Sequence, residues 1–238
     1  MAHVQPQIPK QLQELLIPYA QKIKIKNYFA NYYEYSTLKD LTPKSGNQIS
    51  KKNQLEYADF VLNESRDRLA VSSEILWASK KYSVLVVLQG MDTAGKDGII
   101  SHVLSGFNPQ CCKVHSFKVP SEEEHMHDFL WRYSKKLPER GELAIFNRSH
   151  YEDVLVTKVH PECMEVLPAE LNVHNNANFW KNRYKDINAF ETHLARNGVL
   201  ILKLFLYISK DEQKARLLER LTNEDKYWKV SPADLKER

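Results

Sequence analysis

The stretch that decides the fold is Val84–Ile99, VLVVLQGMDTAGKDGI. An apolar run ends at Gly90, and the loop after it runs to Gly95 and Lys96 before a predicted helix begins. This order of strand, G-x-x-x-x-G-K loop and helix is that of a phosphate-binding P-loop. The glycines allow a tight turn, while backbone N–H groups and the helix N-terminus attract an anion. We therefore expect Lys96 to contact phosphate oxygens. The rest of the predicted phosphate cradle consists of Gly90, Thr93, Ala94 and Gly95.

Two carboxylates accompany this loop. Asp92 lies inside it, and Asp97 occupies the position after the lysine where Ser or Thr is usual. A bare carboxylate about 4 Å from a phosphate would cost on the order of 4 kcal/mol at an effective dielectric constant near 20. A divalent cation between them reverses the sign of this interaction. Asp92 and Asp97 are therefore predicted to hold Mg²⁺ or Mn²⁺, directly or through water. The alternative for Asp97 is an acid that favours a helix N-terminus.

The composition is that of an ordinary globular protein. The chain has 238 residues, 34 of them basic and 30 acidic, and its net charge of +4 is too small to indicate nucleic acid by itself. Its length suits one α/β domain with additional arms. Three cysteines make neither an even disulfide framework nor a CxxC metal site, which favours a reducing cytoplasm. Because no apolar run reaches about 18 residues, we expect no membrane span.

Predicted strands and helices alternate along the chain without an internal repeat. The strands are expected at residues 83–89, 114–120, 142–148 and 199–209. The helices are expected at residues 52–81, 97–107, 121–137, about 175–197 and from 210 onward. Ser121 and Glu124 form a predicted capping box at the third helix. The alternation predicts an α/β, three-layer P-loop kinase fold, with a parallel β-sheet flanked by helices and a C-terminal helical lid. Residues 1–51 are interpreted as an arm.

The segment FNRSHYEDV, Phe146–Val154, follows the third strand and is expected at the same sheet edge as the P-loop. Arg148 is the natural bidentate partner of phosphate oxygens. Asn147 takes the position where a Walker-B strand usually ends in Asp, and it can orient a ligand without adding charge. Glu152 and Asp153 are either ligand-binding acids or acids that favour a helix start. His150 is interpreted as a structural histidine rather than a phosphoryl acceptor.

Two further basic regions are candidates for binding a polyanion. In HDFLWR, Arg132 and the nearby Lys135–Lys136 either line an anion track, which we favour, or form a solvated face, while Trp131 is expected to pack. Near the C-terminus, Arg216 and Arg220 are one helical turn apart, an arrangement that is mildly destabilising unless an anion joins them. A mobile basic lid that closes over phosphates is the favoured interpretation of this tail.

Taken together, the motifs of residues 52–238 resemble those of the family-2 polyphosphate kinases. The matching segments are LQGMDTAGKDG, NPQ at 108–110, HDFLWR, LPERGELAIFNRSHYEDVLV, VHPE at 159–162 and WKVSPADLKER. The form FNRSHYEDV is similar to that of the class III branch. This resemblance implies direct, in-line, magnesium-assisted phosphoryl transfer between inorganic polyphosphate and AMP or ADP. It also implies a family domain at 52–238 that continues beyond Arg238.

The same resemblance implies roles for individual residues. Asp92 and Lys96 match the catalytic pair of the P-loop, and Arg148 matches the phosphate-binding arginine. Arg216, Arg220 and Asp234 fall in the lid, at about 211–238. Asp97 and Arg132 are further predicted phosphate-binding residues, and the predicted nucleotide-binding residues are Asn147, Glu152 and Asp153. The expected partners are polyphosphate, AMP, ADP and ATP, with further copies of the chain in a dimer or tetramer, and neither nucleic acid nor a membrane.

Three other functions stay open at this point. One is an ATP-dependent nucleoside or nucleoside-monophosphate kinase on the same scaffold. A second is a non-catalytic module that binds polyphosphate, although simple anion capture does not require metal-type carboxylates beside Lys96. RNA binding is a weaker alternative, because the chain has no signature of an RNA-binding module.

Overall fold

The computed structural model describes residues 51–164, 177–224 and 227. The chain divides into two compact units, and residues 62–206 form the unit that contains the whole sheet. The other unit includes the first residues of helix α2 (Lys51–Ser79) and helix α8 (Lys210–Thr222). Residues 1–50 of the predicted arm lie outside the described residues, and so does Asp234.

The centre of the first unit is a parallel sheet of four strands. They are β1 (Ser83–Gly90), β2 (Cys112–Ser116), β3 (Leu143–Asn147) and β4 (Val199–Leu206). Their order across the sheet is β2-β3-β1-β4, and all pairs are parallel. The four predicted strands and the parallel sheet are thus confirmed, although the second strand ends at Ser116 rather than at residue 120 and the fourth ends at Leu206 rather than at residue 209. Because β1 and β3 are neighbours, with Leu88 in register with Asn147, the loops that follow these two strands emerge side by side.

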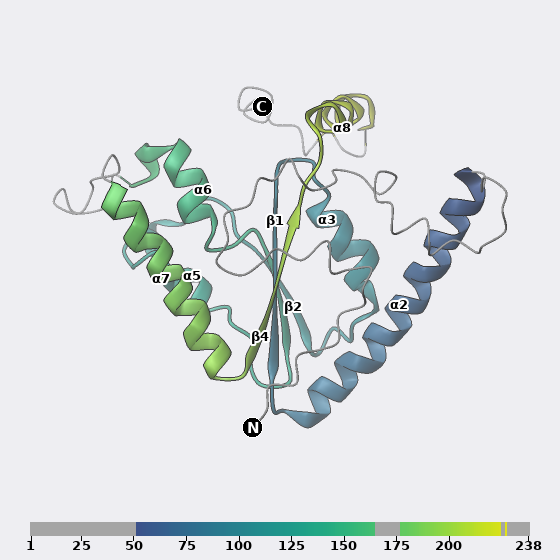
Figure 1. The fold of residues 1–238 in the computed structure, drawn as a ribbon, viewed down its shortest axis with the longest axis horizontal. Coiled ribbons are helices and arrows are strands. Elements are labelled where there is room, and N and C mark those ends of the chain that lie inside the picture. Colours follow the sequence, from purple (N-terminus) through teal and green to yellow (C-terminus); the bar gives the residue numbers. More distant parts are fainter. Residues whose placement is uncertain (1–50, 165–176, 225–226, 228–238) are drawn as a thin grey trace. The chain divides into compact units, whose positions relative to one another are not determined.

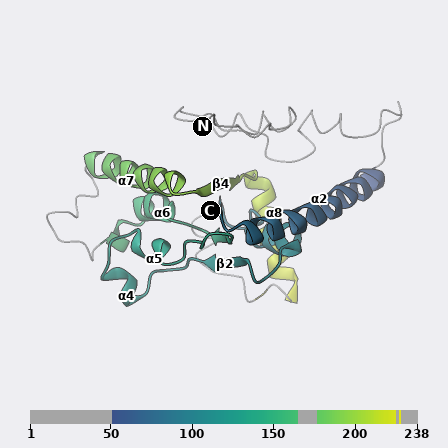
Figure 2. The same ribbon diagram turned by 90° about the horizontal axis from the view of Figure 1, so that it is seen from below.

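Helices cover both faces of this sheet, as Figures 1 and 2 show. On one face lie α2 from Leu62 onward and α3 (Lys96–Gly98), which continues as a π-helical turn (Ile99–Val103) and a 3-10 turn (Leu104–Gly106). The other face carries α5, α6 and α7. The bounds of the elements from β2 to β4 are α4 Glu122–His125, α5 Trp131–Ser134, α6 Glu152–Val159, a 3-10 turn Pro161–Met164 and α7 Ala177–Arg196. The three-layer α/β prediction is therefore confirmed.

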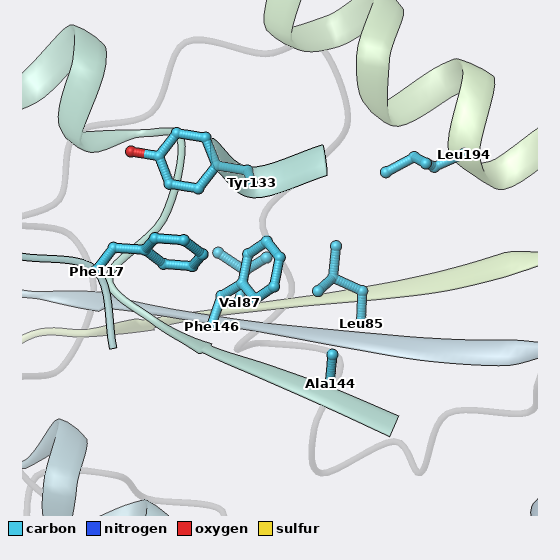
Figure 3. Packing of buried hydrophobic residues seen from close by; sticks show 7 residues of the cluster. All are labelled: Leu85, Val87, Phe117, Tyr133, Ala144, Phe146 and Leu194. Carbon is cyan, nitrogen blue, oxygen red and sulfur yellow. The ribbon is translucent and has the colours of Figure 1, made fainter. Parts of the chain in front are cut away.

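Two apolar clusters hold the layers together, one on each face of the sheet. Figure 3 shows the first, in which Phe117 meets the ring of Phe146 at 4.9 Å and that of Tyr133 at 4.6 Å. The members of this cluster are Leu85, Val87, Phe117, Tyr133, Ala144, Phe146 and Leu194. The second cluster consists of Val86, Leu88, Leu143 and Ile145, packed against the helical turns after the P-loop. Alternate residues of β1 serve opposite clusters, which explains why its sequence is apolar throughout.

The predicted single helix over residues 121–137 is wrong, because two short helices occupy this segment. The capping box is confirmed: the Glu124 N–H donates to Ser121 Oγ, and the Ser121 N–H donates to the Glu124 carboxylate. After α4, the side chain of Asp128 accepts a hydrogen bond from the Leu130 N–H at 2.9 Å. This local bond offers the backbone an alternative to the helical pattern. The other predicted helices are present within the described residues, although the one predicted at 97–107 is α-helical only at its start and the one predicted from residue 210 ends at Thr222.

Two further findings concern the cysteines and the helices. Cys111, Cys112 and Cys163 are all free thiols. Among the residues that the structure describes, no helix combines the length and the apolar character that crossing a membrane requires.

Candidate phosphate-binding and catalytic site

The P-loop leaves the end of β1 in a tight, left-handed path. Thr93 and Gly95 both have positive φ, of 64° and 102°, and the Ala94 N–H donates to the Met91 carbonyl at 3.1 Å. A Cβ on Gly90 would lie 2.7 Å from the Leu206 carbonyl oxygen of β4. Glycine is therefore required at position 90 by the close approach of a neighbouring strand, and at position 95 by its backbone conformation.

Lys96 folds back over the loop that precedes it. Its ammonium donates to the carbonyls of Gly90 at 2.7 Å and Met91 at 3.1 Å. Burial lowers the pKa of Lys96, and the neighbouring charge of Arg148 lowers it further, while Asp92, Glu152 and Asp97 act in the opposite direction. The structure thus holds a partly desolvated cation at the phosphate cradle, where an incoming anion would be strongly attracted.

Arg148 is the residue that joins the P-loop to the segment after β3. One guanidinium nitrogen lies 3.2 Å from Asp92 Oδ1 and another lies 3.3 Å from Glu152 Oε2. The backbone N–H of Arg148 donates to the Leu88 carbonyl at 3.1 Å. The φ of Arg148 is 64°, in the left-handed region. Such a backbone conformation is costly for arginine and is concentrated at functional sites. Lys96 and Asp92 of the P-loop and Arg148 of the FNRSHYEDV segment, predicted from two separate motifs, therefore meet at one edge of the sheet.

Gln89 belongs to the same group, although the sequence did not single it out. This buried side chain donates to Glu152 Oε1 at 2.9 Å, on the carboxylate that also faces Arg148. The amide oxygen of Gln89, Oε1, is buried without a hydrogen-bond partner. The available signal was a lone amide near the end of an otherwise apolar strand, where a buried polar group needs a partner.

Asn147, at the end of β3, connects helix α3 to the end of β2. Its Nδ2 donates to Asp97 Oδ1 at 3.0 Å and lies 3.4 Å from Ser116 Oγ at the end of β2. Asp97 itself is exposed. Asn147 therefore acts as a neutral donor that orients the carboxylate of Asp97. An aspartate at position 147 would repel that carboxylate.

Asp92 and Asp97 fit one kind of magnesium site. Among the described residues no group of three or more His, Cys, Asp or Glu side chains is placed to hold a metal ion. Mg²⁺ at phosphate-transferring sites needs only one or two carboxylates, because substrate phosphates and water supply its other ligands. Two carboxylates that accompany one P-loop and hydrogen-bond to neutral or cationic donors match that requirement.

Comparison with known proteins agrees with this geometry. Residues 53–238 match the family model described as Polyphosphate kinase 2. The chain belongs to this family. The resemblance that the motifs indicated is thus confirmed for the whole sheet and for the P-loop.

Relatives of this polyphosphate kinase 2 chain carry related names. The chain is 48% identical over 183 residues to an ADP-polyphosphate phosphotransferase of Rhodopseudomonas palustris, covering 77% of this chain and 63% of the relative. It is 48% identical over 178 residues to an AMP/ADP-polyphosphate phosphotransferase of Meiothermus ruber, covering 75% and 61%. It therefore spans less than two thirds of the length of these relatives.

A solved structure shares the fold. The crystal structure of polyphosphate kinase 2 from Arthrobacter aurescens superposes with a TM-score of 0.69 at 40% identity, covering 82% of this chain and 65% of that one. The family assignment therefore stands on sequence and on fold.

Two predicted ligand-binding residues of this family member, Asp153 and Arg132, have side chains that contact the protein interior. Asp153 accepts a hydrogen bond from the Tyr133 hydroxyl at 2.8 Å, and burial raises the pKa of its carboxyl group. Arg132 is buried, donates to the Lys118 carbonyl at 2.9 Å and lies 3.5 Å from Glu124. Arg132 lies on α5 and Asp153 on α6, and each hydrogen-bonds to a neighbouring part of the protein. The structure brings neither of them into contact with Lys96 or Arg148.

The remaining predicted residues have the following surroundings. Trp131 stacks on His127 at 3.8 Å with the Lys135 ammonium 4.1 Å from its ring, so this segment packs on itself. On α8, Arg216 donates to Glu212 at 2.6 Å, which offsets the repulsion expected from Arg220. α8 is not part of the unit that contains the P-loop, so the lid roles of both arginines stay predictions.

Proposed function

We propose that the chain transfers phosphoryl groups between inorganic polyphosphate and AMP or ADP, forming ADP and ATP. The observation that carries the proposal is the Arg148–Asp92 pair at 3.2 Å, which joins the P-loop of Lys96 to the FNRSHYEDV segment in a polyphosphate kinase 2 family member. The names of the two relatives, which include ADP and AMP/ADP, support the same acceptors.

The reaction is a direct in-line displacement. An oxygen of the nucleotide phosphate attacks the terminal phosphorus of polyphosphate, the bond to the penultimate phosphate breaks, and the chain leaves shortened by one unit. Lys96 and Arg148 stabilise charge on the equatorial oxygens in the transition state. Phosphate in the cradle competes with Asp92 for the guanidinium of Arg148. A bound magnesium ion, held by Asp92 and Asp97, would offset the charge of adjacent phosphates.

Several finer assignments form part of the proposal. Asn147 and Glu152 take part in nucleotide choice, with Glu152 the one that the Arg148 contact supports. Residues 1–51 form an arm and 52–238 the kinase domain, whose lid at about 211–238 carries Arg216 and Arg220. The chain acts in the cytoplasm as a dimer or tetramer.

One assay tests the reaction. The chain is incubated with Mg²⁺, polyphosphate and, in separate reactions, AMP, ADP, GMP or GDP, and the nucleotides are separated and quantified. ATP formed from AMP and polyphosphate without added ATP supports the proposal, and omission of Mg²⁺ should stop it. Transfer that requires ATP as donor would instead identify a nucleoside-monophosphate kinase. Polyphosphate binding without turnover would identify a binding module.

The absence of a side-chain intermediate is tested in the same reactions. His150 is completely buried, and its Nε2 lies 3.2 Å from Glu191 Oε1. We therefore expect no acid-labile phosphate on the protein during turnover. Labelled phosphohistidine at His150 would contradict direct transfer.

A further inference from the structure

A largely buried carboxylate, that of Glu191 on α7, lies beside the segment that follows β3. Glu191 Oε1 accepts a hydrogen bond from the Tyr151 hydroxyl at 2.7 Å and lies 3.2 Å from His150 Nε2. Its Oε2 lies 2.7 Å from the Lys203 ammonium of β4, which also donates to the Tyr151 hydroxyl at 3.1 Å. These four residues, here called the Glu191 cluster, tie α7 and β4 to the segment between β3 and α6.

That segment also carries Arg148. The backbone of Arg148 is anchored on one side by the hydrogen bond of its N–H to Leu88 on β1. On the other side, the Glu152 N–H donates to the Ser149 carbonyl at 2.9 Å. The two residues between Ser149 and Glu152 are His150 and Tyr151, which both contact Glu191. Arg148 therefore lies between a β1 anchor and the Glu191 cluster, with its φ held at 64°.

The cluster is poorly explained by stability alone. The Lys203 side chain is 49% exposed, and ion pairs with exposed partners contribute about 0 to 1 kcal/mol. The Glu191 side chain is only 12% exposed, and taking a carboxylate out of water is costly unless its oxygens are fully bonded. Apolar side chains of similar volume would stabilise such a position equally well or better. What the carboxylate adds is a defined geometry, since its three donors come from two separate segments, the turn between β3 and α6 and strand β4.

We propose that Glu191 is a positioning residue for Arg148. It holds the His150–Tyr151 turn so that the left-handed backbone at Arg148 is maintained and the guanidinium points to the phosphate cradle. The inference rests on the proposed function, in which Arg148 contacts a phosphate group. Glu191 makes no contact with Lys96, Asp92 or Arg148 in the hydrogen bonds and ion pairs of the described residues, so its effect must pass through the backbone of the turn.

The test is a double-mutant cycle with Glu191→Gln and Arg148→Ala, measured on the 238-residue chain. The first readout is the Kd for inorganic tripolyphosphate by calorimetry, and the second is kcat for the polyphosphate reaction. Glu191→Gln should weaken tripolyphosphate binding about 10-fold and lower kcat about 10- to 100-fold, because misplacing a contact group by about 1 Å has effects of this size. Both losses should largely vanish in the Arg148→Ala background, because the two residues then act as one unit.

A matched control and a second variant keep the test decisive. Asp186→Asn makes the same carboxylate-to-amide change on an exposed position of α7 and should alter neither readout. If Glu191→Gln does not fold, Tyr151→Phe removes one donor to the carboxylate and should show a smaller loss with the same non-additivity. The role of Glu191 is overturned if Glu191→Gln leaves the Kd unchanged. It is also overturned if the loss of affinity in Glu191→Gln adds fully to the loss in Arg148→Ala.

Failure of the proposed function gives a different result. If the wild-type chain binds tripolyphosphate but transfers nothing, the proposed function fails, and the binding cycle still decides whether Glu191 positions Arg148. If the wild-type chain neither binds nor transfers, both proposals are refuted.

Discussion

Replacing Arg148 by glycine and by alanine separates the cost of its backbone from the work of its side chain. Both variants lose the contacts to Asp92 and Glu152, which involve a side chain 42% exposed and are worth about 0 to 1 kcal/mol each. They differ in the backbone, because φ at this position is 64°. A left-handed conformation costs alanine about 1–2 kcal/mol and costs glycine almost nothing. The larger entropy of glycine in the unfolded chain offsets about 0.4–1 kcal/mol of that advantage.

The balance predicts an inverted order of stability. Arg148→Gly should be more stable than Arg148→Ala by about 0.5–1 kcal/mol, whereas glycine usually follows alanine. For a chain of this length, each kcal/mol of stability corresponds to about 2–4 °C in Tm. The midpoint of denaturant unfolding provides an independent measure of the same difference. Both variants should lose phosphoryl transfer by about 100-fold or more, since both remove a preorganised cation. A more stable alanine variant would refute the backbone argument, and near-normal turnover in either variant would refute the role of the side chain.

Three further changes have defined outcomes. Lys96→Met should lose about 100-fold or more in kcat while the denaturant midpoint changes little, and a variant that keeps turnover would reject Lys96 as the phosphate-contacting cation. Gly90→Ala should cost about 1–3 kcal/mol in unfolding free energy, because its Cβ would meet a backbone oxygen of Leu206 at 2.7 Å, and wild-type stability would contradict this packing. Burial raises the pKa of Glu191, but hydrogen bonds from His150, Lys203 and Tyr151 outweigh it and lower the pKa from 4.5 to about 2. The stability that the ionised carboxylate contributes is therefore present above pH 4.5 and lost as the pH falls toward 2. Unfolding free energies measured over this range should show the advantage of the wild type over Glu191→Gln shrinking with acidification, and a constant difference would count against the lowered pKa.

Much of the fold was predictable because its signals are local. The apolar runs that became β1, β3 and β4 and the glycine-bounded loop before Lys96 are contiguous in sequence, and each reports its own backbone conformation. The helix over residues 121–137 was mispredicted for a local reason as well. Helical spacing continues through Asp128, but a side-chain hydrogen bond to the Leu130 N–H competes with it.

The candidate site was predictable only in part. Asp92, Lys96 and Arg148 were identified because motifs place them at the ends of adjacent strands, and the structure brings them together. Nothing in the local pattern distinguishes Glu152, which faces Arg148, from Asp153, which turns toward Tyr133 in the core. Adjacent residues at a helix start point in different directions, and only the packing of α6 decides which of them reaches the site.

The sequence by itself therefore determined a parallel α/β sheet with a phosphate loop and the residue types of the site, since backbone propensity and short-range spacing are written locally. Tertiary structure alone decided which side chains act together. Gln89 meets Glu152 across 63 positions, Arg148 meets Asp92 across 56, and Tyr151 meets Glu191 across 40. Such pairs form because strand order and helix packing bring distant segments within hydrogen-bond distance, and one sequence without its fold does not contain that information in any local pattern.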